Sequence, residues 1–304
     1  MKPSRNFVLN FAAGSLVTLA LVGGLAFRET PRGKTPANDT QARWTPPALP
    51  KELSFAGENV PLSRWDVKER LDRELLFNFY SPANVLVLKK LSNRYFPAIS
   101  ERLKVHGVPD DFKYLCVAES NLLSGATSRA GAKGFWQFMD GTAPGYGLTS
   151  NDQVDERSDI YKSTDAACKY LKAAYAKFGN WTAAAASYNC GMGGYNGQAT
   201  YQQTYNYYDL LLPEETNRYI FRILALKHLL GNSEQLGFVV ENDDLYHEIP
   251  FREVQVTSSI PNLAQFAINN GTTFKILRQM NPWLKGRALT VSGGKTYTLK
   301  LPAQ

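Results

Sequence analysis

A long apolar run near the N-terminus is the first feature in the pattern of hydrophobic and polar positions. Residues 7–27 contain no charged side chain over 21 positions, and Lys2 and Arg5 precede them. A helix of this length can cross a bilayer core of ~30 Å, and positive charge ahead of it keeps its N-terminal end in the cytoplasm. The run exceeds the ~15 residues of a signal-peptide core, which favours a retained anchor, although Gly24 and Ala26 would suit signal cleavage. Under either interpretation the protein is exported. The remaining alternative is a buried core helix.

A proline-rich stretch separates this run from the rest of the chain. Residues 28–50 hold five prolines among polar side chains. Such a composition is typical of an extended, poorly ordered linker. We therefore predict a signal anchor or signal peptide at residues 1–27, and a linker at residues 28–50 that holds the folded part away from the membrane.

Helical periodicity dominates the middle of the chain. Spacings of three and four between apolar residues indicate helices with one buried face. They occur over residues 62–105, 110–123, 159–178, 181–189 and 214–231. In the last segment a proline, Pro213, and two glutamates stand at the start and Gly231 stands at the end, as helix termini prefer. Because no long alternating pattern interrupts residues 60–230, we predict a mainly α domain over residues 51–245.

The tail has a different pattern. Residues 253–257 and 295–301 alternate between apolar and polar side chains, as strands do. Between them, residues 263–267 suggest a short helix, and residues 274–280 suggest a second one with apolar side chains at a spacing of three. The order is strand, helix, helix, strand, and we predict a small βααβ module at residues 246–304.

Composition and charge exclude several classes of protein. The 304 residues are 44% hydrophobic and 20% charged, as in ordinary globular proteins. The net charge of +7 comes mainly from the flanks of the N-terminal apolar run, whereas a nucleic-acid-binding protein would show a dense basic stripe. The sequence has no P-loop, and no dinucleotide-binding glycine motif follows a predicted strand. We therefore expect no nucleic-acid partner and no nucleotide cofactor.

Cysteine and histidine are scarce. The three histidines are far apart and none stands beside a cysteine, so a standard zinc site is not expected. Cys116, Cys168 and Cys190 lie among apolar residues, which predicts small buried thiols rather than a disulfide. No metal and no other cofactor is predicted.

One carboxylate stands on an apolar helix face. The predicted helix at residues 110–123 carries a single stripe made by Phe112, Leu115, Glu119 and Leu122. A buried carboxyl group resists ionisation, so its pKa rises, and a raised pKa is what a general acid needs near neutral pH. The alternative is a buried ion pair between Glu119 and an Arg or Lys elsewhere in the chain.

Four short motifs begin at this glutamate. They are residues 118–120 (AES), 134–139 (GFWQFM), 186–191 (ASYNCG) and 215–220 (ETNRYI). In this order they resemble the motifs of the family 1 lytic transglycosylases, most of all the membrane-bound type D branch. The resemblance covers residues 85–232. It departs from the usual pattern at Phe135, where Leu is common, and at Ser187 and Cys190, where small residues such as Ala are frequent.

The resemblance implies a lysozyme-like (SLT) catalytic domain that acts on peptidoglycan. In the family, a single glutamate cleaves the β-1,4 bond between N-acetylmuramic acid (MurNAc) and N-acetylglucosamine (GlcNAc) and leaves a 1,6-anhydro-MurNAc end. Glu119 matches that glutamate, which first protonates the leaving oxygen and then takes the proton of the C6 hydroxyl as this oxygen closes on C1. The resemblance implies neither a metal nor another cofactor.

An ordinary glycosidase needs a second carboxylate. The nearby candidates are Asp140, Asp152, Asp155 and Glu156. They lie in a polar, loop-rich stretch, where we expect them to cap helices or face solvent. In the family, the N-acetyl group of the substrate is thought to assist at C1, so no second carboxylate is required.

Three further matched residues bring polar groups to the site. The resemblance implies that Ser120 forms hydrogen bonds near the acid, and that Tyr219 hydrogen-bonds close to Glu119. Gln137 is expected to contact sugar hydroxyls or acetamides, because its amide can donate and accept at once. The alternatives are a local backbone bond for Ser120 and a plain core position for Tyr219.

The remaining matched residues would shape the binding surface. The resemblance implies that Phe135 and Trp136 line an acetamide pocket, with simple core packing as the alternative. Tyr188 and Asn189 match the motif that forms the floor of the cleft.

The tail resembles a LysM module. The resemblance is carried by residues 254–256, 263–267, 281–283 and 297–302. The family implies binding to chains of GlcNAc. Residues 257–259 are Thr-Ser-Ser where Gly-Asp-Thr is usual, in a segment that helps to bind glycan in the family. The alternative is a structural cap on the catalytic domain.

These features together predict an exported peptidoglycan lytic transglycosylase of the periplasm or cell envelope, anchored by an N-terminal helix. Its partners would be the glycan strands of peptidoglycan and, through residues 7–27, the inner membrane. Two alternatives stay open. One is a goose-type lysozyme, which is a hydrolase, and the other is a non-catalytic peptidoglycan-binding protein.

Overall fold

The computed structural model describes residues 45–303, and the chain from Pro46 onward forms one compact unit. The predicted export segment at residues 1–27 and all but the end of the linker lie outside the described residues. Among the helices described, none combines the length and the apolar character that a membrane crossing requires.

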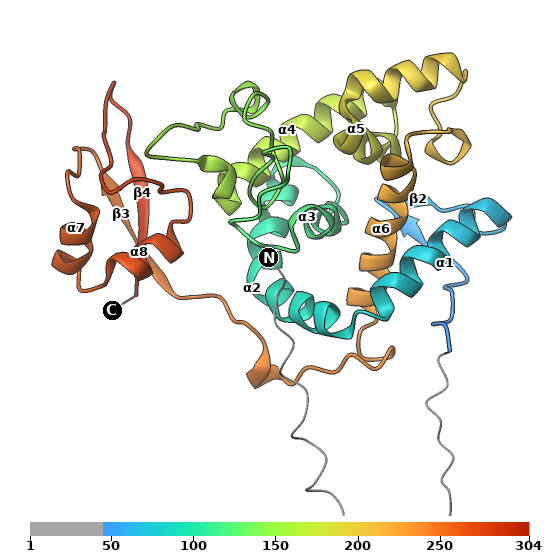
Figure 1. The fold of residues 1–304 in the computed structure, drawn as a ribbon, viewed down its shortest axis with the longest axis horizontal. Coiled ribbons are helices and arrows are strands. Elements are labelled where there is room, and N and C mark those ends of the chain that lie inside the picture. The colour runs from blue at the N-terminus through green and yellow to red at the C-terminus, as the bar shows by residue number, and fades with distance from the viewer. Residues whose placement is uncertain (1–44, 304) are drawn as a thin grey trace, which may run out of the picture. The chain divides into compact units, whose positions relative to one another are not determined.

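Helices make up most of the chain before residue 232 (Figure 1). They are α1 (Trp65–Phe79), α2 (Pro82–His106), α3 (Phe112–Ser120), α4 (Ile160–Phe178), α5 (Trp181–Tyr201) and α6 (Glu214–Gly231). A two-residue hairpin, β1 (Ser54–Phe55) and β2 (Glu58–Asn59), precedes them. Short 3-10 turns lie between α3 and α4 and after α5. The predicted mainly α architecture is confirmed.

The short helix α3 is central to this part of the fold. It packs against α2 and α6, while α6 also packs against α1 and α5, and α4 packs against α2 and α5 (Figure 1). Phe112 and Leu115 on α3 are completely buried in the apolar cluster that these helices share. The position of α3 therefore places the end of its last turn, where Glu119 stands, among the longer helices.

Two helix boundaries differ from the periodicity. The helix predicted to reach residue 123 ends at Ser120, because Asn121 and Leu122 adopt left-handed backbone angles, with φ of 51° and 60°. The helix predicted at residues 181–189 continues to Tyr201 across a kink at Gly191, which has φ 77° and ψ 148°. Only glycine adopts that combination readily, since it has no Cβ.

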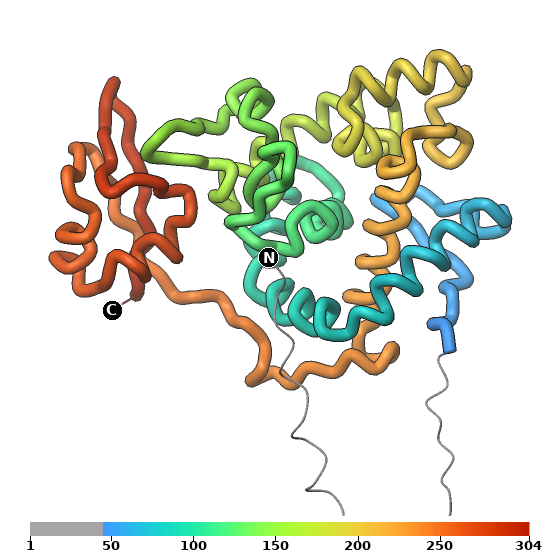
Figure 2. Tube along the Cα trace, viewed as in Figure 1, coloured from blue at the N-terminus to red at the C-terminus, as the bar shows by residue number. Residues whose placement is uncertain are grey.

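The tail folds as predicted, in the order β3 (Phe251–Val256), α7 (Leu263–Asn269), α8 (Phe274–Met280) and β4 (Tyr297–Pro302). The two strands pair antiparallel, with Phe251 opposite Pro302 and Val256 opposite Tyr297. A second apolar cluster fills the space between these strands and helices. Figure 2 traces the connection from α6 to β3, which runs along α2, where Asn93 and Arg94 donate hydrogen bonds to its backbone.

Candidate active site

Glu119 is held by a tyrosine from another helix. Tyr219 on α6 is 2% exposed, and its phenolic O–H donates a hydrogen bond to Oε1 of Glu119. Ile223 and Leu226, on the same face of α6, are buried and fix that helix against the core. Tyr219 is therefore both a buried core residue and the hydrogen-bond partner of Glu119. The core position and the hydrogen bond, which were considered as alternatives, occur together.

The surroundings of Glu119 favour its protonated form. The side chain is partly buried, and burial raises the pKa of Glu119 to about 7. The hydrogen bond from Tyr219 and the charge of Arg222 lower this pKa, while the charge of Glu215 raises it. Burial outweighs the two stabilising groups, so the carboxyl group holds its proton up to neutral pH and can still release it.

The loop after α3 carries Gln137. This residue has a backbone φ of 48°, which is uncommon for residues other than glycine and asparagine. Its Nε2 donates to the carbonyl oxygens of Ala126, at 3.1 Å, and Gly134, at 2.8 Å. The side chain remains partly exposed, so the loop fixes the amide nitrogen, and contact of this side chain with sugar stays a prediction.

The aromatic residues of the second motif lie in the core. Phe135 is 1% exposed and packs edge-on against Tyr95, and Trp136 is fully buried, with its Nε1 donating to Oγ1 of Thr164 at 2.8 Å. This is the packing expected under the core alternative. Whether either ring also borders an acetamide pocket stays a prediction.

The third motif links the second motif to the fourth. Tyr188 on α5 donates its hydroxyl hydrogen to the carbonyl oxygen of Trp136 at 2.8 Å. Asn189 accepts a hydrogen bond from Oγ1 of Thr216 at 2.7 Å, and its Nδ2 donates to Glu215 at 3.3 Å. Burial raises the pKa of Tyr188 well above its usual value, and the charge of nearby Glu119 adds to this. The structure thus brings Tyr188 close to Glu119.

Ser120 bonds within its own helix. It is 6% exposed, and its Oγ donates to the carbonyl oxygen of Cys116 at 3.2 Å. This is the local backbone bond that was the alternative for Ser120. A contact between Ser120 and substrate stays a prediction.

Two of the four loop carboxylates are buried, although the sequence suggested exposed or helix-capping positions. Asp155 and Glu156 were expected to cap helices or face solvent, but they are only 1% and 6% exposed. Asp155 pairs with Arg157, at 2.8 Å, and with Lys133, at 3.0 Å, while Glu156 pairs with Lys162. Burial works to raise the pKa of Asp155, but the hydrogen bonds from Arg157 and Lys133 hold it below its usual range.

The expectation fails because the folded chain brings Lys133, Arg157 and Lys162 against these two carboxylates, and no helical or strand period reveals such contacts. Asp140 and Asp152 are exposed, as expected, although Asp140 also reaches Arg157 at 3.2 Å. Within residues 45–303, none of these four carboxylates is bonded to Glu119.

Sequence reasoning missed the charged neighbours of Glu119. Arg222 and Glu215 act on its pKa from α6, one on each side of Tyr219. The signal was present, because residues three and four apart on a helix share a face. Applied to Tyr219, this rule would have placed both charges near the carboxyl group.

The cysteines and the potential metal ligands of the described residues do not indicate a second functional site. Cys116 and Cys168 are buried and Cys190 is partly buried, all three as free thiols. In the described part of the chain, no group of three or more His, Cys, Asp or Glu side chains is arranged to hold a metal ion.

Comparison with known proteins gives two domain matches. Residues 97–211 match the transglycosylase SLT domain, and residues 252–304 match the soluble lytic transglycosylase C-terminal LysM-like domain. Both matched ranges fall inside the predicted domains at 51–245 and 246–304, whose outer boundaries stay a prediction.

Two curated relatives are similar to this chain over part of their length. Over 205 residues the chain is 30% identical to the membrane-bound lytic murein transglycosylase D of Escherichia coli strain K12, and to that of strain O6:H1. These matches cover 66% of this chain and 44% of each relative, so the chain spans less than half the length of the curated relatives it matches.

Two solved structures are more distant. An inactive mutant of lytic transglycosylase Slt from Pseudomonas aeruginosa is 20% identical with a TM-score of 0.39, covering 50% of this chain and 26% of that one. The 70 kDa soluble lytic transglycosylase of Escherichia coli is 18% identical with a TM-score of 0.40, covering 61% and 34%. On the strength of the two domain matches, the resemblance seen in the motifs is confirmed: the chain carries a transglycosylase SLT domain followed by a LysM-like C-terminal domain.

Proposed function

We propose that the protein is a peptidoglycan lytic transglycosylase that cleaves the β-1,4 bond between MurNAc and GlcNAc and forms 1,6-anhydro-MurNAc. The SLT domain match and the name of the relatives support this substrate class. The observation that carries the proposal is Glu119, a partly buried carboxyl group with a pKa near 7 that is held by Tyr219. An acid with a pKa near the working pH is suited to give a proton and then take one back.

The proposed reaction uses Glu119 twice. In the first step, its protonated carboxyl group gives the proton to the glycosidic oxygen as the C1–O bond breaks. In the second step, the carboxylate takes the proton of the MurNAc C6 hydroxyl while that oxygen bonds to C1. The hydrogen bond from Tyr219 stabilises the carboxylate formed between the steps and restricts its orientation.

The positions of the four loop carboxylates support a single-residue scheme. A hydrolase with two carboxyl groups holds the second one ~5–9 Å from the first, as nucleophile or base. In this protein Asp155 and Glu156 are engaged in ion pairs, while Asp140 and Asp152 are exposed on the loop. An internal nucleophile, the C6 hydroxyl of the substrate itself, removes the need for a second carboxylate.

Product analysis tests the proposal. Purified sacculi are digested with the protein, and the released muropeptides are examined by mass spectrometry. We expect products lighter by one water than those of a lysozyme digest. Reducing ends would show a goose-type hydrolase instead, and sacculi that bind the protein but release nothing would show a non-catalytic binding protein.

The pH dependence of the reaction should follow the protonation state of Glu119. Since burial raises its pKa to about 7, the acid is protonated below that pH, and activity should fall as pH rises through it. Tyr219→Phe removes a hydrogen bond that lowers this pKa. We therefore expect the alkaline limb of the pH–rate profile to move to higher pH, and maximal turnover to fall by about tenfold.

Another buried tyrosine provides the control. Tyr195 on α5 is fully buried and donates its hydroxyl hydrogen to the carbonyl oxygen of Tyr205. Tyr195→Phe should leave the alkaline limb in place. An unmoved limb in Tyr219→Phe would show that Glu119 is not the group that titrates.

Location and the role of the tail are also part of the proposal. We propose that residues 1–27 export the chain and anchor it in the inner membrane, so that residues 51–245 act in the periplasm or cell envelope. The LysM-like module at residues 246–304 is proposed to bind GlcNAc chains. Retention in the membrane fraction after an alkaline wash tests the anchor, and release into the wash would contradict it.

A further inference from the structure

The C-terminal module is joined to the catalytic domain by more than its connecting chain. The backbone N–H of Asp155 donates to the carbonyl oxygen of Trp283, and that of Lys285 donates to Gln153, both at 2.7 Å. The side chain of Gln153 forms two hydrogen bonds with Thr290. These contacts pair a loop of the catalytic domain with the segment that follows α8.

An apolar contact reinforces the junction. Val154 is 1% exposed and belongs to the apolar cluster of the C-terminal module, although it lies in the catalytic domain's sequence. Backbone hydrogen bonds and buried apolar surface together hold such a contact in one geometry. A pocket lined by both domains at this junction is therefore preformed.

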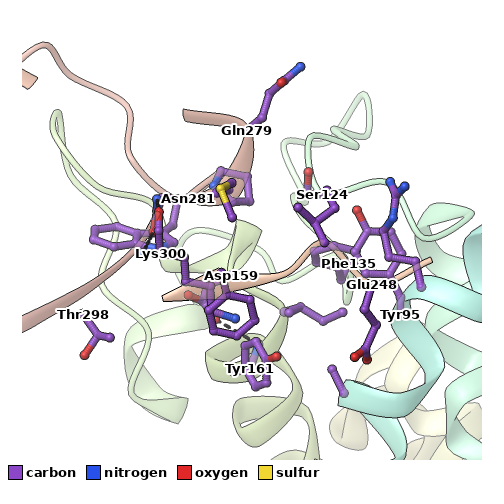
Figure 3. A pocket seen from close by; sticks show the side chains of 18 residues that line it. Tyr95, Ser124, Phe135, Asp159, Tyr161, Glu248, Gln279, Asn281, Thr298 and Lys300 are labelled. Carbon is purple, nitrogen blue, oxygen red and sulfur yellow. Dashed lines mark hydrogen bonds between the residues drawn. The ribbon is translucent and has the colours of Figure 1, made fainter. Parts of the chain in front are cut away.

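Such a pocket exists beside the junction (Figure 3). Its cavity volume is about 160 Å³, and it opens to solvent. Residues of α2 and the start of α4 line one part of it, and the end of α8 with strands β3 and β4 lines another.

A lysine with unused hydrogen bonds lies in this pocket. The Nζ of Lys300 is 3.8 Å from the ring centre of Tyr161 and 4.0 Å from that of Phe251. Within residues 45–303, this ammonium group forms no hydrogen bond and no ion pair at 4 Å or less. Burial lowers the pKa of Lys300, and the charge of Asp159 counteracts the burial. The two rings thus hold a cation that can still donate hydrogen bonds to a ligand entering the pocket.

Charges of both signs line the remaining wall. Figure 3 shows Asp159 beside Lys300 and Tyr161, with Glu248 on the other side of the pocket. One oxygen of Asp159 accepts hydrogen bonds from the backbone at the start of α4, and the other has no partner among the described residues. Arg94 donates its Nε–H to the carbonyl oxygen of His247, and its guanidinium group lies over the ring of Tyr246, 5.2 Å from the ring centre. The lining therefore offers two cations and two carboxylates.

We propose that this pocket binds the stem peptide of peptidoglycan, an inference that rests on the proposed function. A glycan strand of N-acetylated sugars has no free amine, and its lactyl carboxyl group is already bound to the peptide. The stem peptide ends in a carboxylate and, where it is not cross-linked, carries a free amine. The carboxylate would meet Lys300 and Arg94, and the amine would meet Asp159 and Glu248, in charge-assisted hydrogen bonds.

Binding without turnover tests this assignment. The full chain in detergent micelles, carrying Glu119→Gln, is titrated by calorimetry with a synthetic stem tetrapeptide that contains diaminopimelate. We expect saturable binding, and Lys300→Met should weaken it by about tenfold. Lys295→Met provides the matched control, because Lys295 is exposed elsewhere in the same module and does not line the pocket.

Changes to the peptide separate a specific site from weak surface attraction. A tetrapeptide with an amidated C-terminus should bind the Lys300 form as weakly as the free acid binds Lys300→Met. An absence of saturable binding, an unchanged affinity in Lys300→Met, or displacement of the peptide by tetra-N-acetylchitotetraose would each overturn the proposal. Since no cleavage is measured, a failure here differs from a failure of the transglycosylase assay, which the unsubstituted protein performs on sacculi.

Discussion

Glu119→Gln is expected to lower the release of anhydro-muropeptides by roughly 10²–10⁴-fold, the contribution of a general acid–base group. The amide has nearly the same shape and can still accept the hydrogen bond of Tyr219, so α3 and α6 should stay in place. It cannot give a proton to the glycosidic oxygen. Liquid chromatography of digested sacculi, with circular dichroism to confirm the fold, measures the loss.

Glu214→Gln is the matched control for this substitution. Glu214 is exposed at the start of α6 and pairs with Arg73 at 3.3 Å, a surface contact of small energetic value. The same change of carboxylate to amide should leave product release near the level of the unsubstituted protein. Substantial activity in Glu119→Gln would place the proton donor elsewhere and remove the central step of the proposed reaction.

The position of Glu119 on a buried helix face could be predicted from the sequence because a helix repeats every 3.6 residues. This period placed Glu119 on the same stripe as Phe112 and Leu115, and the structure buries both apolar residues completely. The period also predicted the long helices and the alternation of the two tail strands. Motif order added Tyr219, which lies 100 positions away in the chain and donates a hydrogen bond to Glu119.

The contacts of the loops were harder to predict from the sequence, because they join residues that share no helical or strand period. The pairing of Asp155 with Lys133 forms only when two loops pack together, and composition alone suggested solvent-facing carboxylates. The two left-handed residues that end α3 are equally hidden. Leu122 is a poor choice for positive φ, yet its side chain is buried there, and tertiary packing overrides its local preference.

The aromatic residues of the second motif show a different limit of prediction from the sequence. A sequence pattern tells which side chains are apolar, but it does not tell whether a ring lies in a core or lines a pocket. Trp136 is fully buried and Phe135 nearly so, whereas Gln137 next to them is partly exposed. The backbone turns sharply at this point, and the turn begins with Gly134, whose φ is 83°.

Gly134→Ala is expected to destabilise the catalytic domain by about 3 kcal/mol or more, combining overpacking with an unfavourable positive φ. A Cβ at this position would lie 1.8 Å from the carbonyl oxygen of Arg157 and 2.4 Å from its carbonyl carbon. Both atoms are backbone, and the neighbouring ion pair with Asp155 restrains them. Relief would require the loop that carries Gln137 to move, so product release should fall as well.

Gly131→Ala separates the steric clash from the backbone strain. Gly131 lies in the same loop with φ 85°, but a Cβ there would meet no atom within 4 Å. Its substitution should therefore cost only about 1 kcal/mol, the usual penalty for a non-glycine residue in the left-handed region. Urea unfolding of both variants measures the difference. Equal losses of stability would mean that backbone strain alone accounts for the need for glycine, and that the close approach of Arg157 does not hold the loop.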